Sequence, residues 1–289
     1  MQQANASDNL LVLGTAQDGG YPHTGCSEDC CREAWKDSNQ KRLIASLAVL
    51  DGKDCFLVDI TPDFKYQLQL IEHHINEKPR ISGICITHAH LGHYMGLLEL
   101  GLEVMNTNDI PVYVMPKMKS FLENNAPFTQ LLELNNIRLL ALQDNYPIDI
   151  FKDVKITPFQ VPHRNEYSET VGYRIQSSHH SVIYIPDIDS WDRWDTDINQ
   201  LIKESDIALL DGTFYDKTEL KNRDVSAIPH PSIRESINFF SALDKMDRKK
   251  VNFTHLNHTN NVLREGSEAR KDVIQQGFQI AYDGMVISI

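Results

Sequence analysis

The sequence predicts an α/β protein in which two mixed β-sheets lie between outer helices. Short apolar runs alternate with amphipathic, helix-like segments in the first half of the chain, and from Ile137 onward the pattern becomes richer in strands. Strand patterns occur at both ends, so both ends are expected to contribute to sheets. Because the 289 residues contain no internal repeat and no Gly/Ser-rich linker, they are expected to form a single domain over 1–289.

The first half of the chain supplies five expected strands, each an apolar run ending near a polar residue or a glycine. Asp18 to Pro22, after the first of them, has the composition of a turn. The expected strands are residues 10–15, 46–50, 55–59, 81–86 and 111–115. The expected helices between and after them are residues 64–77, 94–106 and 118–125.

The second half contains more strands than helices. The expected strands are residues 154–159, 171–175, 181–185, 207–211, 250–254 and 279–289. The expected helices are residues 232–243 and 264–276. Alternation at one end and strand-rich sequence at the other favour two packed sheets over one open sheet.

Charge and hydropathy limit the classes of partner. The formal net charge of −12 argues against a nucleic-acid backbone, which is bound by clustered Lys and Arg. No apolar run approaches the roughly 20 residues that cross a bilayer, so a small-molecule substrate is expected and a membrane is not. Oligomeric state stays open between a monomer and a homodimer. Residues 1–8 are polar and are interpreted as a disordered, tag-derived or processed stub, which leaves the compartment open between cytoplasm and periplasm.

Three histidines carry the strongest chemical signal. His88, His90 and His93 follow a buried apolar run and precede a helix-like segment. Two histidines separated by one residue cannot share a helical face, but at the end of a strand both rings can converge on one cation. His163, Asp187 and His255 also follow apolar runs. Since strand ends collect ligand residues from distant parts of an α/β chain, this set predicts a metal site.

The five cysteines fall into two groups. Cys55 and Cys85 lie in apolar strand-like runs and are expected to be buried free thiols. Cys26, Cys30 and Cys31 are packed into six residues, a crowding more typical of metal binding than of a disulfide framework.

The order of these residues resembles the metallo-β-lactamase superfamily from Leu10 to the end of the chain. That family has an Asp closing a strand, a clustered His motif, a lone His, an Asp after a strand and a final His. The corresponding residues here are Asp59, His88, His90, His93, His163, Asp187 and His255. The resemblance implies the αββα sandwich of that family.

Within the superfamily, the chain looks most like the B proteins of pyrroloquinoline quinone biosynthesis and, more distantly, the cyclic phosphodiesterase of phosphonate breakdown. The resembling segments are Leu13–Thr15, Gly19–Pro22, Leu210–Phe214, Thr254–Asn260 and Ala281–Met285. The quinone-biosynthesis proteins lack the full His-x-His pair that this chain retains, which favours hydrolysis over an oxidative step.

The resemblance implies a first catalytic metal site of His88, His90 and His163, bridged by Asp187. The second site keeps His93, Asp187 and His255, but Gly92 stands where the family has a metal-binding Asp. The second metal is therefore expected to be weak or absent, or to take another carboxylate. Asp18 is the candidate replacement ligand; the alternative is that Asp18 only stabilises a turn with Gly19 and Gly20.

Both relatives carry a cysteine-rich zinc site after the first strand. The corresponding structural metal ligands here are Cys26, Cys30, Cys31 and His258, with an altered spacing because Glu28 stands where a cysteine is expected. His23 is an alternative ligand for this site. A closed thiolate-rich site is structural and performs no chemistry.

The leading functional hypothesis is metal-activated hydrolysis of an ester-like small molecule, with a phosphodiester as one candidate. Asp187 is expected to orient the attacking water, and His230 to protonate the leaving oxygen unless it is only a loop histidine between prolines. Arg164 is expected to bind an anionic substrate or to be a surface cation. Zn²⁺ is the expected metal, one structural and one or two catalytic, with Fe²⁺ or Mn²⁺ as alternatives in the catalytic site. The competing hypotheses are an iron-dependent oxygenase of cofactor biosynthesis and a non-catalytic metal carrier.

Overall fold

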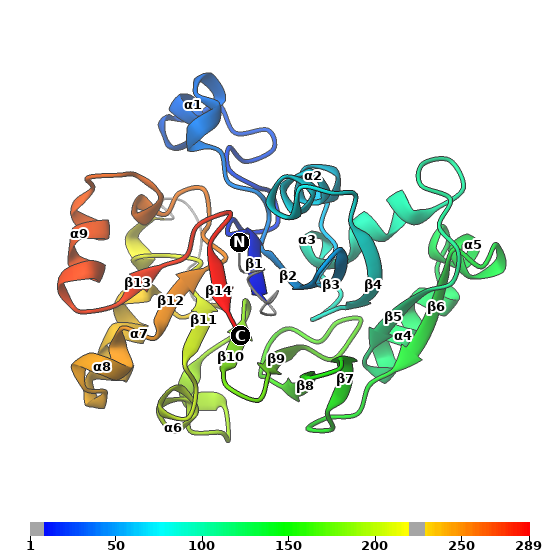
Figure 1. Cartoon of the computed structure of the whole chain (residues 1–289). Helices are drawn as coiled ribbons and strands as arrows, with labels where there is room; N and C mark the ends of the chain where they lie inside the picture. The colour runs from blue at the N-terminus through cyan, green and yellow to red at the C-terminus, as the bar shows by residue number, and fades with distance from the viewer. Residues whose placement is uncertain (1–8, 220–228) are drawn as a thin grey trace, which may run out of the picture.

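The computed structural model describes residues 9–219 and 229–289, and the stub predicted for residues 1–8 lies outside this part of the chain. Two seven-stranded sheets pack face to face (Figure 1). The first sheet has the order β14 (Val286–Ser288), β1 (Asn9–Gly14), β2 (Ser46–Asp51), β3 (Asp54–Val58), β4 (Arg80–Cys85), β5 (Ile110–Val114) and β6 (Ile137–Ala141). The second has the order β13 (Gln279–Ile280), β12 (Val251–Thr254), β11 (Ile207–Asp211), β10 (Ser181–Ile185), β9 (Val171–Gln176), β8 (Val154–Gln160) and β7 (Ile148–Phe151).

Helices cover the outer face of each sheet, which confirms the predicted sandwich. α2 (Phe64–Ile75), α4 (Pro116–Asn124) and α5 (Phe128–Glu133) bury apolar side chains against the first sheet. The corresponding elements on the second sheet are α6 (Ile198–Lys203), α7 (Ile233–Phe239) and α9 (Glu268–Gln275). The remaining helices are α1 (Asp29–Lys36), α3 (Leu91–Tyr94) and α8 (Lys245–Arg248), with short 3₁₀ turns such as η2 (Met95–Leu100), η3 (Trp191–Arg193) and η6 (Phe240–Ala242).

The core between the sheets is built from side chains of both. Phe56 of β3 faces this layer from the first sheet, and Tyr173 of β9 and Tyr184 of β10 face it from the second. All three are almost completely buried. The Tyr173 hydroxyl donates a hydrogen bond to the Ile86 carbonyl, which ties the second sheet to the segment just after β4.

Two predicted helices differ in extent from the structure. In place of the helix expected over 94–106, the α-helical turn α3 ends at Tyr94, and η2 follows it and ends at Leu100. Gly96 explains the irregularity, because a Cβ there would lie 2.3 Å from the Thr61 carbonyl oxygen, so this segment packs too closely on its neighbour for a regular helix. The helix predicted from Arg264 begins instead at Glu268, where Ser267 caps it.

The strand expected over 279–289 is two strands in different sheets. β13 pairs with β12 of the second sheet, and β14 pairs with β1 of the first. A turn at Tyr282–Gly284 changes direction between them, and Gly284 there has φ +86°. An apolar pattern alone does not indicate which sheet a short strand joins.

Parallel pairing brings the functional ends of the strands together. β3, β4 and β5 are mutually parallel in the first sheet, as are β10, β11 and β12 in the second. Their carboxyl ends therefore meet at one edge of the sandwich. No helix within 9–219 and 229–289 is both long and apolar enough to cross a membrane.

Candidate metal centre

The first cluster consists of His88, His90, His163 and Asp187. One ligand atom from each lies within 4.8 Å of the others. His88 and His90 follow β4, His163 follows β8 and Asp187 follows β10. His90 Nδ1 lies 2.8 Å from His88 Nε2 and 3.3 Å from His163 Nε2, and Asp187 Oδ1 lies 3.7 Å from His163 Nε2. The structure thus brings together the whole first ligand set predicted from the sequence.

The second cluster consists of Asp18, His93 and His255, and Asp187 adjoins it through its other oxygen. Asp187 Oδ2 lies 3.2 Å from His93 Nε2 and 3.4 Å from His255 Nε2. Asp18 Oδ1 lies 3.5 Å from His93 Nε2. Asp187 therefore faces both clusters, one carboxylate oxygen toward each.

The atoms of the second cluster are buried but unsatisfied. Asp18 Oδ1, His93 Nε2, Asp187 Oδ2 and His255 Nε2 have no hydrogen-bond partner within the described residues. A buried polar atom without a partner costs about 1–3 kcal/mol, and here several such atoms face one another. Converging imidazole nitrogens and carboxylate oxygens are the donor set that zinc and iron accept, so these residues fit a cation.

Gly92 and Asp18 occupy one place in space. A Cβ on Gly92 would lie 2.2 Å from Asp18 Oδ1 and 2.8 Å from its Cα, closer than any side chain allows. The missing side chain at position 92 is what allows Asp18 to reach the cluster. Of the two readings of Asp18 open from the sequence, this geometry favours the ligand over the turn residue.

The surroundings of the clustered histidines and carboxylates shift their pKa values. Burial lowers the pKa of His88 well below its usual range and that of His90 to about 4, which keeps both rings neutral and able to coordinate. Burial alone would raise the pKa of Asp18, but the nearby imidazole of His93 lowers it to about 2. The carboxylates of Asp18, Asp59 and Asp187 all lie beside His93. Although burial opposes it, the charges of Asp59 and Asp187 raise the pKa of His93 well above its usual range, so this position favours a positive charge.

A set of hydrogen bonds orients the histidine rings. Asp59 accepts from His93 Nδ1 at 2.7 Å and Asp189 from His163 Nδ1 at 2.9 Å, so both rings present Nε2 to the clusters. Asp59 itself has φ +66° and accepts from the Thr87 backbone N–H at 2.7 Å. The sequence reasoning missed Asp189, although its place two residues after Asp187 was a signal.

His230 lies at the edge of the centre, bonded to a second carboxylate. Its Nδ1 is 2.7 Å from Asp211 Oδ2, and its Nε2 is 4.0 Å from Asp187 Oδ1. Asp211 also accepts from the Thr213 hydroxyl, which contacts His255 Nδ1 at 3.1 Å. Asp211 closes a strand as Asp59 does, and that parallel was the available signal for its role.

Arg164 stands at the exposed side of the first cluster. Its Nη2 lies 3.3 Å from His90 Nε2, and its Nε lies 3.8 Å from a carboxylate oxygen of Glu166. About half of the Arg164 side chain and half of the Glu166 side chain are exposed. Arg164 is thus beside the centre rather than elsewhere on the surface.

The cysteine cluster is Cys26, Cys30, Cys31 and His258, whose ligand atoms also lie within 4.8 Å of one another. His258 Nδ1 is 3.4 Å from Cys30 Sγ and 3.3 Å from Cys31 Sγ. All three thiols are free, and burial raises the pKa of Cys31 to about 12, so ionisation would need a neighbouring cation. Cys30 lies within the cluster, whereas Glu28 is exposed.

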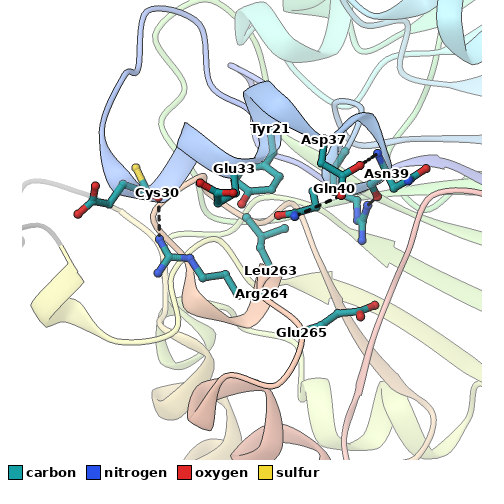
Figure 2. A pocket seen from close by; sticks show the side chains of 11 residues that line it. Tyr21, Cys30, Glu33, Asp37, Asn39, Gln40, Leu263, Arg264 and Glu265 are labelled. Carbon is teal, nitrogen blue, oxygen red and sulfur yellow. Dashed lines mark hydrogen bonds between the residues drawn. The ribbon is translucent and has the colours of Figure 1, made fainter.

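A cavity of about 510 Å³ borders the cysteine cluster. Cys30, Tyr21 and Arg264 face it, together with several carboxylates of the α1 region (Figure 2). None of the residues of the first or second cluster lines this cavity. This cavity therefore borders the cysteine cluster and not the His/Asp centre.

The chain is similar to known proteins over nearly its whole length. In an alignment of 307 positions it is 25% identical to coenzyme PQQ synthesis protein B of Xanthomonas campestris pv. campestris (strain B100), covering 97% of this chain and 99% of that protein. The same protein from Methylorubrum extorquens (strain PA1) is also 25% identical, over 97% of this chain and 100% of its own length.

Solved structures share the fold over nearly the whole chain. Zn²⁺-bound PqqB from Methylobacterium extorquens superposes with a TM-score of 0.82 at 23% identity, covering 97% of this chain and 100% of the other. A diphosphatase from the PhnP family gives 0.67 at 23% identity, covering 97% and 96%. The model of the beta-lactamase superfamily domain matches residues 55–256, which include most of the His/Asp centre. The chain belongs to the beta-lactamase superfamily.

Proposed function

We propose that the protein is a metal-dependent hydrolase that holds two catalytic cations in the first and second clusters and a structural cation in the cysteine cluster. The observation that carries the proposal is the set of buried, unsatisfied ligand atoms around Asp187, whose oxygens face the two clusters separately. Zinc is the metal we favour for all three positions, since imidazole, carboxylate and thiolate are its usual ligands.

The expected chemistry is attack of water on an ester-like centre. Cations in the centre would lower the pKa of bound water toward about 7 and polarise the electrophile. Asp187 accepts a hydrogen bond from the attacking water and orients it between the two clusters. Asp59 and Asp189 keep His93 and His163 in the orientation that presents Nε2, which prepares the site before substrate arrives.

His230 is the proposed proton donor to the leaving oxygen. Asp211 holds its Nδ1–H, which leaves Nε2 as the atom that gives the proton. Although burial opposes protonation, the neighbouring carboxylate of Asp211 raises the pKa of His230 above its usual value. A cavity of about 290 Å³ lined by His230, Trp191 and Phe239 lies beside it and gives the leaving group room.

Arg164 supports an anionic ester as the substrate class. Its guanidinium is next to His90 at the open side of the first cluster, where it can bind a phosphoryl or carboxylate oxygen by paired hydrogen bonds. A phosphodiester carries its negative charge on the reacting centre, so it fits both Arg164 and the cations.

Metal analysis and a substrate panel test the proposal. Protein purified without added metal should contain close to three divalent cations per chain, one for each group of ligands. It should hydrolyse at least one member of a panel comprising a chromogenic phosphodiester, a thioester and a lactam, with turnover lost on chelation and restored by Zn²⁺. Turnover of none of them by fully loaded protein would contradict hydrolysis.

The names of the curated relatives support one competing function, a step in cofactor synthesis. Under that hypothesis the first cluster holds iron, since few carboxylates and several histidines suit Fe²⁺ with open positions. Iron in the purified protein together with oxygen consumption would favour it over hydrolysis.

A further inference from the structure

The ring of His23 covers Gly19, the residue that follows Asp18. A Cβ on Gly19 would lie 2.3 Å from both Cδ2 and Nε2 of His23, so the imidazole rests directly on the Gly19 backbone. The Thr24 N–H donates to the Gly19 carbonyl at 3.1 Å, which closes the loop between them. His23 therefore limits where Gly19, and with it the Asp18 carboxylate, can move.

The same histidine contacts the cysteine cluster on its other side. The ring of His23 packs on the ring of His258 with centroids 4.3 Å apart. The His23 backbone N–H donates to Cys31 Sγ at 3.3 Å, and the Cys26 N–H donates to the His23 carbonyl at 3.0 Å. His23 is not one of the residues whose ligand atoms form the cysteine cluster, so its contacts there are those of a neighbour.

Backbone pairing adds a second connection to the same part of the centre. Gln17 N–H donates to the Leu256 carbonyl at 3.0 Å, and Leu256 N–H donates to the Thr15 carbonyl at 2.7 Å. Leu256 lies between His255 of the second cluster and His258 of the cysteine cluster. The loop that leads from β1 to Asp18 is thus held beside the segment that carries His255 and His258.

The first cluster is oriented by other residues. His88 and His90 follow β4 and His163 follows β8, and their orienting partners are Thr87 and Asp189. The ring of His23 packs against Gly19, next to Asp18 of the second cluster, and not against the segments that carry the first cluster. Any influence of the cysteine cluster should therefore fall on the second cluster.

We propose that His23 is a positioning residue that couples the cysteine cluster to the second cluster: packed between His258 and Gly19, it fixes Asp18 where the second cation binds. The proposal rests on the proposed function in one respect, the assignment of the second and cysteine clusters as cation sites. It adds that the cation of the cysteine cluster sets the affinity of the second catalytic position and not that of the first.

Two substitutions of His23 separate packing from ring chemistry. His23→Ala removes the ring over Gly19, whereas His23→Phe keeps a ring of similar shape without its nitrogens. Affinities of the two catalytic positions are measured by competition of zinc with a chromogenic chelator, and total metal is measured by mass spectrometry. His74→Ala, on the exposed face of α2, is the matched control.

The expected result is selective. His23→Ala should weaken the second position by about 10- to 100-fold, the range found when an orienting neighbour of a metal ligand is lost, and leave the first within about twofold. His23→Phe and His74→Ala should both resemble the wild type. Unchanged affinity in His23→Ala, equal loss in His23→Phe, or equal weakening of the first position would each overturn the proposal.

A second pair of variants tests the coupling from the cysteine side. Cys30→Ser weakens the cysteine cluster and should also weaken the second position, whereas Cys30→His keeps a zinc ligand there and should restore it. A second position indifferent to Cys30→Ser would contradict the coupling. If the wild type binds no cation at the first or second cluster, the proposed function fails; if it binds both and neither depends on His23, only the coupling fails.

Discussion

The first and second clusters share Asp187 but are assembled differently. The first takes His88 and His90 from one short segment after β4 and adds His163 from the end of β8 in the other sheet. The second joins Asp18 from the beginning of the chain to His255 near its end, and it needs Gly92 to leave space for the Asp18 carboxylate. A local motif therefore supplies two ligands of the first cluster, whereas the second depends on packing between distant segments.

Because Asp187 faces both clusters, its substitution should affect both catalytic cations, whereas substitution of a residue in one cluster should affect one cation. Asp187→Asn removes the charge that faces both clusters and should lower the metal content from about three cations per chain to about one. Turnover should fall by about 10³-fold or more, since a catalytic metal supplies several kcal/mol. Mass spectrometry of metal content and assay of the best panel substrate check this, with the exposed Asp195→Asn as control. Retention of one catalytic cation would show that the clusters are independent.

Variants at positions 18 and 92 test whether the Asp18 carboxylate takes the place of the metal-binding Asp that the family has at position 92. Asp18→Ala should lose the second cation and keep the first. Gly92→Asp alone should destabilise the fold by about 1–3 kcal/mol, the usual cost of overpacking, because its side chain collides with Asp18. The double variant Asp18→Gly with Gly92→Asp removes the clash with the Asp18 carboxylate but not the 2.8 Å approach to the Cα of residue 18, so it should recover stability in part and bind the second cation more tightly than either single variant. Thermal unfolding and chelator competition measure the two effects, and failure of the double variant to improve on either single one would count against the exchange.

Loss of the cysteine cluster should mainly affect stability. Cys31→Ser removes a buried ligand, and we expect the unfolding midpoint to fall by about 5 °C or more because metal binding to such a site adds directly to folding free energy. The first cluster should keep its cation. Scanning calorimetry with and without chelator checks this, and the exposed Ser27→Ala in the same loop is the control. An unchanged midpoint in both buffers would mean that this cluster holds no structural cation.

The smallest effect is expected at Asp283, which supports the segment that carries Asp18. Its carboxyl group accepts hydrogen bonds from the Thr15 hydroxyl and the Leu43 N–H, and burial raises its pKa to about 6. Because the unfolded chain loses this proton near pH 4 and the folded chain near pH 6, the free energy of unfolding should fall as pH rises through this window.

Asp283→Asn keeps an uncharged acceptor for the Leu43 N–H, and its amide N–H can donate to the Thr15 hydroxyl oxygen once that hydroxyl, which donates to Asp283 in the wild type, has rotated. It should therefore remove that fall and stabilise the protein at pH 7 by about 1–2 kcal/mol. Urea unfolding at pH 4 and pH 7 measures the difference, and Asp153→Asn on the surface provides the comparison. Equal pH dependence in the variant and the wild type would exclude Asp283 as its source.

Much of the fold followed from local pattern, and its failures have identifiable causes. The strands around the centre were predicted because buried runs such as 81–86 and 207–211 are apolar and short. The helix expected over 94–106 was wrong since the close approach of Gly96 to Thr61 is not encoded in helical periodicity. The final strand was divided between sheets because a turn at Gly284 pairs with Val12 of β1, a partner that local sequence does not identify.

The sequence by itself determined that His88 lies beside His90 and that the three crowded cysteines lie together, since residues two to five positions apart must be close wherever the chain goes. His163 and Asp187 were predicted from the order of the motifs, because the sequence contains no distance between them and His88. Only the tertiary structure decided that Asp18 stands in the space left by Gly92, that Asp211 holds His230, and that His23 joins the cysteine cluster to the Asp18 loop. Those relations depend on distances between segments far apart in the chain. Such distances are set by the packing of two sheets, and no local pattern of residues specifies them.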